Sequence, residues 1–133
     1  MSGELVLVVE DNQKSRKLVR DVLRFHGFAT LDAATAAEGL ALAREHRPRL
    51  ILLDIQLPDF GGEVALVRLR AEQATAAIPV VAFTAFAMKG DRERLLAAGF
   101  DGYLAKPVDI RALPEQVRGF CAAGVRARPW IEG

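Results

Sequence analysis

Apolar residues occur in short continuous runs that alternate with longer segments of mixed polarity along most of the chain. A strand that is covered on both faces needs apolar residues at nearly every position, so a short continuous run is typical of it. The runs predict five buried strands, at Leu5 to Val9, Phe28 to Leu31, Leu50 to Leu53, Ile78 to Phe83 and Gly102 to Leu104.

The segment after the first run carries the signals of an amphipathic helix. Asn12 is a residue type that caps helix starts, and Leu18, Val22 and Phe25 recur on one face of the helix that follows. Gly27 is expected to end this helix. The pattern therefore predicts a strand followed at once by a helix.

Similar signals follow the other runs. Thr35 and Glu38 have the spacing of a capping box, which marks the start of a second helix. The remaining helices are predicted from Thr35 to about His46, Glu63 to about Gln73, Lys89 to Ala98 and Ile110 to Ala122, the last becoming regular only at Pro114. Five strand-then-helix units predict right-handed crossovers and a parallel sheet with helices on both faces.

Polar groups stand where several of the predicted strands end. Glu10 and Asp11 follow the first strand, Asp54 the third, Thr84 the fourth and Lys106 the fifth. Taken singly, each has an ordinary explanation, such as a helix cap or a surface lysine. Because the carboxyl ends of parallel strands meet at one edge, where open α/β sheets bind ligands, their joint placement predicts one functional site.

The chemistry of these groups suggests what the site holds. Three carboxylates repel one another unless a cation or protons neutralise them. Mg²⁺ fits, because it prefers oxygen ligands and takes one or two carboxylates together with water and a phosphate oxygen. With Lys106 as a second positive charge and the Thr84 hydroxyl nearby, Asp54 is the candidate nucleophile for a phosphoryl group. Catalysis would then consist mainly of positioning and charge neutralisation.

Composition narrows the class of protein further. A chain of 133 residues is the length of one domain, and its net charge of +1 gives no reason to expect nucleic acid or an anionic membrane as a partner. A single cysteine, no leader segment and no membrane-length apolar run favour a cytoplasmic protein. Composition shifts at Gly124, which predicts a domain at residues 1–123 and a tail at 124–133 that contains Trp130.

The motifs VVEDN, LLDIQLPDFGG, PVVAFTAFAMKGD and GYLAKP resemble those of response-regulator receiver domains, the CheY-like proteins, and most of all single-domain receivers of the DivK type. The resemblance covers Leu5 to about Ala122. It implies a flavodoxin-like three-layer α/β/α fold, with a five-stranded parallel sheet in the order 2-1-3-4-5 and five helices.

The resemblance also implies roles for single residues. Asp54 would be the phosphoacceptor, and Mg²⁺ would be held by Asp11, the Asp54 carboxylate and the Gln56 backbone carbonyl. Glu10 would act through a metal-bound water. Further roles would be a hydrogen bond from Thr84 to the phosphoryl group, an ion pair of Lys106 with it, a cis peptide at Lys106–Pro107 and an aromatic switch at Tyr103.

Other functions are compatible with parts of the pattern. A phosphatase of the haloacid-dehalogenase type needs a second Asp two residues after the nucleophile, but here that position is Gln56, which cannot transfer a proton. A flavin-binding protein needs a first loop that cradles phosphate, and the acidic EDNQ loop would repel it. An interaction module that is never phosphorylated would leave the joint presence of Asp54, Thr84 and Lys106 unexplained.

The favoured hypothesis is a single-domain response regulator of a two-component phosphorelay, with a receiver excised from a hybrid histidine kinase as the alternative. A histidine kinase or phosphotransfer protein would phosphorylate Asp54 and bias the domain between two conformations. The downstream protein would bind the fourth helix, fifth strand and fifth helix, roughly Lys89 to Ala122. Phe86 and Gln56 could shield the phosphoaspartate from water and lengthen its lifetime.

Overall fold

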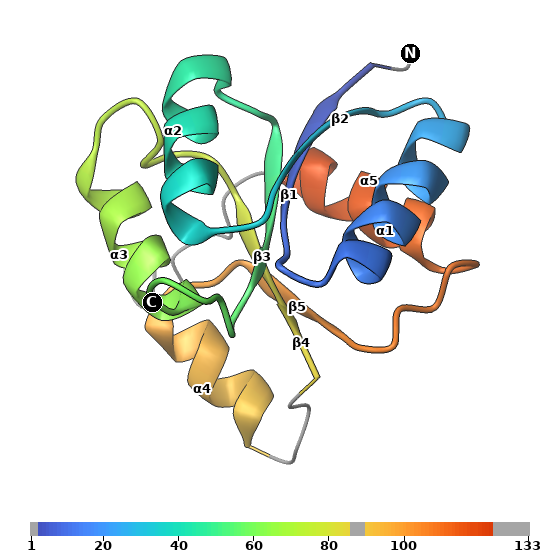
Figure 1. Ribbon diagram of the computed structural model, residues 1–133. Helices are drawn as coiled ribbons and strands as arrows, with labels where there is room; N and C mark the ends of the chain where they lie inside the picture. The colour runs from blue at the N-terminus through green and yellow to red at the C-terminus, as the bar shows by residue number, and fades with distance from the viewer. Residues whose placement is uncertain (1–2, 86–89, 124–133) are drawn as a thin grey trace.

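Five parallel strands form one sheet in the order β2-β1-β3-β4-β5 in the computed structural model, which describes residues 3–85 and 90–123 (Figure 1). The strands are β1 Leu5–Val9, β2 Ala29–Ala33, β3 Leu50–Asp54, β4 Val80–Thr84 and β5 Gly102–Ala105. β1 pairs with both β2 and β3, so the strand order reverses beside β1. The predicted fold class and strand order are confirmed.

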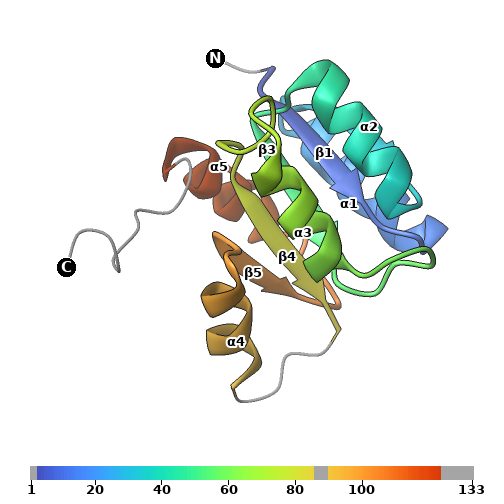
Figure 2. The same cartoon turned by 90° about the vertical axis from the view of Figure 1, so that its left-hand side faces the viewer.

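Helices cover both faces of the sheet (Figures 1 and 2). They are α1 Gln13–Phe25, α2 Ala36–His46, α3 Gly62–Ala71, α4 Asp91–Ala98 and α5 Leu113–Ala123. Alternate residues of β1 point to opposite faces: Val6 and Val8 pack with α1 and α5, whereas Leu7 and Val9 pack with α2, α3 and α4. The sheet is therefore buried on both sides, as its continuous apolar strands predict.

Two of the predicted helix starts have the expected capping hydrogen bonds. The Asn12 side chain accepts from the backbone N–H of Ser15 at 2.9 Å. The Thr35 hydroxyl oxygen accepts from the N–H of Glu38 at 3.1 Å, and the Glu38 carboxylate accepts from Ala34 at 3.1 Å. The short-range signals thus locate where α1 and α2 begin.

Some predicted boundaries are wrong. β2 runs from Ala29 to Ala33, one to two residues later than expected, because its register follows β1, with Leu5 opposite Ala29 and Val9 opposite Ala33. α5 begins at Leu113 and not at Ile110, and Pro114 is its second residue. The Asp109 carboxylate accepts from the N–H groups of Arg111 and Ala112, which makes a turn ahead of the helix.

The predicted apolar face of α1 is not its buried face. Val19 and Leu23 are buried, whereas Leu18 is 43% exposed and Phe25 is 86% exposed. The two sets have similar helical spacing and lie about 100° apart, so periodicity cannot decide which set meets the sheet. Val22 lies at the edge between them.

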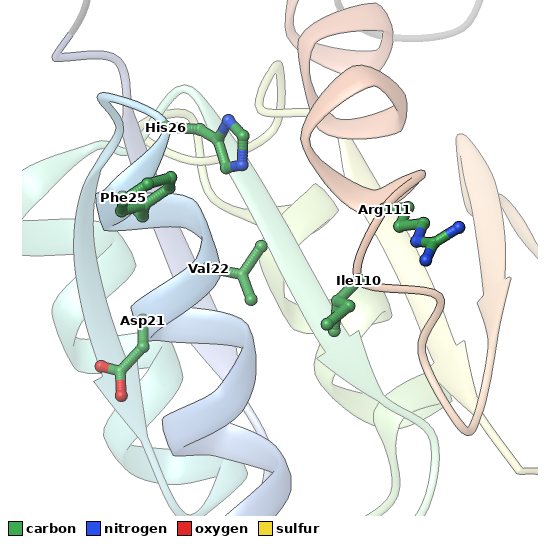
Figure 3. Close-up of a pocket in the computed structure, with 6 residues that line it drawn as sticks. All are labelled: Asp21, Val22, Phe25, His26, Ile110 and Arg111. Carbon is green, nitrogen blue, oxygen red and sulfur yellow. The ribbon is translucent and has the colours of Figure 1, made fainter.

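The outward side of α1 forms one wall of a shallow groove of about 530 Å³. Val22 and Phe25 lie on one side, and Ile110 and Arg111 lie across from them in the loop before α5 (Figure 3). Ile110 is itself 48% exposed. Val22 and Phe25, which the sequence places on the buried face of the helix, therefore contribute to an exposed apolar surface.

Parts of three expectations lie outside the described residues: the tail at 124–133 with Trp130, the position of Phe86, and the start of the fourth helix at Lys89. Within the described ranges, no helix is long and apolar enough to cross a membrane. Cys121 is buried against the sheet, and burial raises the pKa of its thiol to about 11, which makes it a packing residue.

Candidate functional site

The predicted site residues lie at the carboxyl-terminal end of the sheet, toward which all five parallel strands run. Glu10 directly follows β1, Asp54 is the last residue of β3, and Lys106 directly follows β5. Each side chain leaves the sheet where its strand ends. The parallel topology therefore brings together groups that are as many as 96 residues apart in sequence.

Lys106 connects the two buried acids of the site. Its ammonium donates a hydrogen bond to Asp54 Oδ2 at 2.9 Å and forms an ion pair with Glu10 Oε1. Glu10 is fully buried and Asp54 is 4% exposed, while Asp11 beside them is exposed. The Lys106 backbone N–H donates to the Thr84 carbonyl at 2.8 Å, which anchors the loop that carries the ammonium.

Backbone amides hold the other oxygens of the two buried acids. The Asn12 N–H donates to Glu10 Oε2 at 2.8 Å, and the Gln56 N–H donates to Asp54 Oδ1 at 2.9 Å. Arg16 donates to the backbone carbonyl of Glu10 at 2.8 Å. The acids are thus oriented by the turns that follow their own strands.

The three carboxylates fit a hard divalent cation. Glu10, Asp11 and Asp54 each place one oxygen within 4.8 Å of an oxygen of the other two. Glu10 Oε1 is buried and, although it lies against the ammonium of Lys106, it accepts no well-formed hydrogen bond from the described residues. Three carboxylates that bring their oxygens this close together form the kind of all-oxygen donor set that Mg²⁺ takes, directly or through water.

The pKa values of this cluster are shifted. The pKa of Glu10 is raised to about 7. Burial is the largest cause, Lys106 and the Asn12 backbone amide oppose it, and Asp54 adds to it. Burial lowers the pKa of Lys106, but its contacts with Glu10 and Asp54 outweigh this effect and raise it above the ordinary value. Lys106 therefore remains an ammonium at neutral pH, and Glu10 is the group that changes charge there.

Glu10 should make the stability of the metal-free protein depend on pH. Its pKa is about 7 in the folded protein against 4.5 ordinarily, so the folded state binds more protons between these values. The contribution of Glu10 protonation to the free energy of unfolding is fully present below pH 4.5 and is lost as pH rises through 7. The free energy of unfolding should fall by at most about 1.4 kcal/mol per pH unit in this range. Urea unfolding from pH 5 to 8 in a chelator measures it.

The matched control for this prediction is Glu10→Gln, which keeps the shape of the side chain and cannot titrate. The wild-type curve minus the Glu10→Gln curve should fall with pH without metal. Added Mg²⁺ should flatten or reverse the difference, because the cation favours the ionised carboxylate. Equal slopes for the two proteins without metal would show that Glu10 does not cause the effect.

The remaining predicted residues lie around the cluster. Thr84 ends β4, is buried and pairs with Ala105, and the Lys106–Pro107 peptide is cis. Tyr103 lies on β5 and is half-buried. It lines a hollow of about 270 Å³ between α4, β5 and α5, together with Arg92, Leu96, Asp101, Gly102 and Phe120.

Sequence reasoning missed two residues that shape the loop after β3. A Cβ on Gly62 would lie 2.5 Å from the Asp54 carbonyl oxygen and 2.9 Å from Ile55 Cα, so only glycine fits there. Gly61-Gly62 reads simply as a turn in the sequence. Asp59 binds the start of α2, and a bond across 22 residues leaves no local signal.

Comparison with known proteins agrees with this geometry. The family model of the response regulator receiver domain matches residues 6–118. The chain belongs to this family. Receiver domains work with histidine kinases and downstream effectors in two-component signalling, so the domain is a signalling module and not a turnover enzyme.

The receiver is similar to several response regulators and receiver domains over most of its length. It is 43% identical to the polar-differentiation response regulator DivK of Brucella anthropi and 42% identical to that of Brucella ovis, covering 86% of this chain and 94% of each relative. The receiver domain of the sensor histidine kinase PA1611 from Pseudomonas aeruginosa, which has a magnesium ion coordinated in its active-site cleft, superposes with a TM-score of 0.82 at 32% identity, over 91% of this chain and 99% of that one. A CheY-like receiver from Methanospirillum hungatei superposes with a TM-score of 0.79 at 31% identity, over 91% of this chain and 95% of that one.

Proposed function

We propose that Asp54 is the phosphoacceptor of this receiver and that the phosphorylated domain signals by binding another protein. The observation that supports this most strongly is the environment of Asp54. Its carboxylate contacts the Lys106 ammonium at 2.9 Å and lies within 4.8 Å of two further carboxylates at the open edge of the sheet. A bound cation, an ammonium and an acceptor carboxylate are the groups that a transferred phosphoryl group requires.

Magnesium is the proposed cofactor. The Asp11 and Asp54 carboxylates and the Gln56 backbone carbonyl would hold it, and the buried Glu10 would bind through a water molecule. When bound, it neutralises negative charge on the carboxylates and on the phosphoryl oxygens. The Gln56 backbone N–H already donates to Asp54 Oδ1, which keeps this loop close to the proposed phosphoacceptor.

In the proposed reaction, an Asp54 oxygen forms a bond to phosphorus while the P–N bond of a phosphohistidine breaks. The imidazole leaves with the bonding electron pair. Lys106 pairs with the new phosphoryl oxygens, and the Thr84 hydroxyl donates a hydrogen bond to them. Gln56 cannot act as an acid or base, so loss of the phosphoryl group to water is slow and the signal persists.

The proposed readout surface consists of α4, β5 and α5. Tyr103 reaches it from β5, and Thr84 lies next to Ala105 on the neighbouring strand. The hollow beside Tyr103 gives the ring space to change its position. A new hydrogen bond to Thr84 would then shift the equilibrium between two conformations of this surface.

Acetyl phosphate tests the proposal without knowledge of the natural donor. Incubation with acetyl phosphate and Mg²⁺ should add the mass of one phosphoryl group to the intact protein, and a chelator should prevent the gain. Phosphorylation should also change amide hydrogen exchange in β5 and α5. No gain in mass with Mg²⁺ present would refute the proposed function.

The groove beside α1 is the proposed docking surface for the phosphodonor protein. α1 begins directly after the acidic loop, and Ile110 stands four residues after Lys106, so a protein seated here reaches the site. α1 carries many basic side chains, and its one acid, Asp21, is already paired with Lys17 at 2.7 Å and with Arg20 at 3.2 Å. An apolar groove in basic surroundings fits an acidic amphipathic helix.

Phe25→Ser should therefore slow transfer from a protein donor. We expect about a tenfold loss in the rate from a histidine kinase or phosphotransfer protein that phosphorylates the wild type, since exposed aromatic anchors carry much of an interface. The rate from acetyl phosphate should be unchanged. Val67→Ser, on α3 and 66% exposed, is the matched control and should affect neither rate. Equal transfer to both variants would place the donor elsewhere.

A further inference from the structure

Asp59 ties the loop after β3 to the start of α2. Its two carboxylate oxygens accept hydrogen bonds from the first two backbone N–H groups of that helix, from Ala36 to Oδ1 at 3.0 Å and from Ala37 to Oδ2 at 2.9 Å. The residue lies between Gln56 and Gly61 in sequence, in the loop that joins β3 to α3, and is part of neither α2 nor α3. One exposed side chain therefore joins two elements that are distant in the chain.

Asp59 completes the cap of α2 from a distant loop, by binding two N–H groups that Thr35 does not reach. Thr35 already binds the Glu38 N–H, and the corresponding role at α1 is filled by Asn12 from within its own segment. Asp59 supplies negative charge at the positive end of a helix dipole, which makes both bonds charge-assisted. Burial raises the pKa of Asp59, but the amide bonds outweigh it and lower the pKa, so the carboxylate stays ionised at neutral pH.

The loop that Asp59 holds carries the candidate metal ligand. One fixed point is at its start, where the Gln56 N–H donates to Asp54 Oδ1. Another is at its end, where the Gly62 N–H donates to the Ile55 carbonyl at 2.9 Å. Residues 57–61 span the distance between them. A tie in the middle of this span limits how far the Gln56 carbonyl can turn away from the acids.

We propose that Asp59 is a positioning residue for Mg²⁺, which holds the Gln56 carbonyl in place by fastening its loop to α2. The inference rests on the proposed function, because it assumes that the cluster of Glu10, Asp11 and Asp54 binds this ion. Mutation of residues that orient metal ligands from outside commonly weakens metal binding about tenfold or more. The competing explanation is that Asp59 stabilises only α2.

The experiment compares Asp59→Ala with Thr35→Ala. Both remove a cap from the same helix, and each should lower the melting temperature by roughly 4 °C. Only Asp59→Ala releases the loop. Calorimetric titration with MgCl₂ should show about tenfold weaker binding for Asp59→Ala and an unchanged affinity for Thr35→Ala. Asp59→Asn keeps one acceptor oxygen and should remain folded even if Asp59→Ala does not. Its Mg²⁺ affinity should lie between those of Asp59→Ala and Thr35→Ala.

Kinetics give a second readout. With acetyl phosphate, the Mg²⁺ concentration for half-maximal rate should rise about tenfold in Asp59→Ala, while the rate at saturating Mg²⁺ stays near that of the wild type. Equal Mg²⁺ affinities for the two alanine variants would overturn the inference and leave Asp59 as a helix cap. Failure of the wild-type protein to bind Mg²⁺ would instead refute the proposed function.

Discussion

Asp54→Asn is expected to take up phosphoryl groups from acetyl phosphate roughly a hundredfold more slowly than the wild type, or not at all. The amide is a poor nucleophile and carries no charge for Mg²⁺ or Lys106 to bind. Its oxygen can still accept the Gln56 N–H that now binds Asp54 Oδ1 at 2.9 Å. The variant should therefore keep the fold and lose the chemistry.

Intact mass over time with acetyl phosphate and Mg²⁺ measures this effect, and unchanged circular dichroism checks the fold. Asp21→Asn is a matched control, because it removes a carboxylate that is exposed on α1, away from the cluster, and should leave the rate unchanged. A mass gain that survives in Asp54→Asn would mean that another residue is the acceptor.

Arg70→Met is expected to lower the free energy of unfolding by about 3 kcal/mol. The guanidinium donates to the carbonyls of Ala76 at 3.2 Å, Ile78 at 2.6 Å and Gly99 at 3.3 Å, and to Asp101 Oδ2 at 2.7 Å. It joins the end of α3 to the segments before β4 and β5. Methionine fills similar volume but leaves three carbonyls without this donor and a carboxylate only 3% exposed without its cation.

The ion pair between Arg94 and Glu63 provides the control, because its N–O distance is also 2.7 Å but its side chains are 52% and 46% exposed. Arg94→Met should cost less than about 1 kcal/mol, since water screens an exposed pair. Denaturant unfolding compares the two variants. Adding Asp101→Asn to Arg70→Met should recover part of the loss, because the buried charge is then removed. Equal losses for Arg70→Met and Arg94→Met would contradict the argument.

Local sequence was enough to predict features that depend on neighbouring residues. Asn12 and Thr35 cap their helices where expected, because a cap bonds to an amide three residues away. The central strands were found because they are buried along all or nearly all of their length, as in Leu50–Asp54 and Val80–Thr84. Errors arose where the partner is distant: the bounds of β2 depend on its pairing with β1, and the buried face of α1 depends on how it packs against the sheet.

The sequence by itself determined the alternation of strands and helices, and hence a parallel sheet whose strand ends carry Glu10, Asp11, Asp54, Thr84 and Lys106. Those features can be predicted from the chain because the strand and helix periods of apolar residues show within a few neighbouring positions. Only the tertiary structure decided that the Lys106 ammonium contacts both buried acids, that Asp59 holds α2, and that Phe25 faces the solvent. The first two contacts join residues 22 to 96 positions apart, and the exposure of Phe25 depends on packing between layers. Charges and hydrogen bonds act through space, so the separation of two residues in the sequence does not indicate whether they meet.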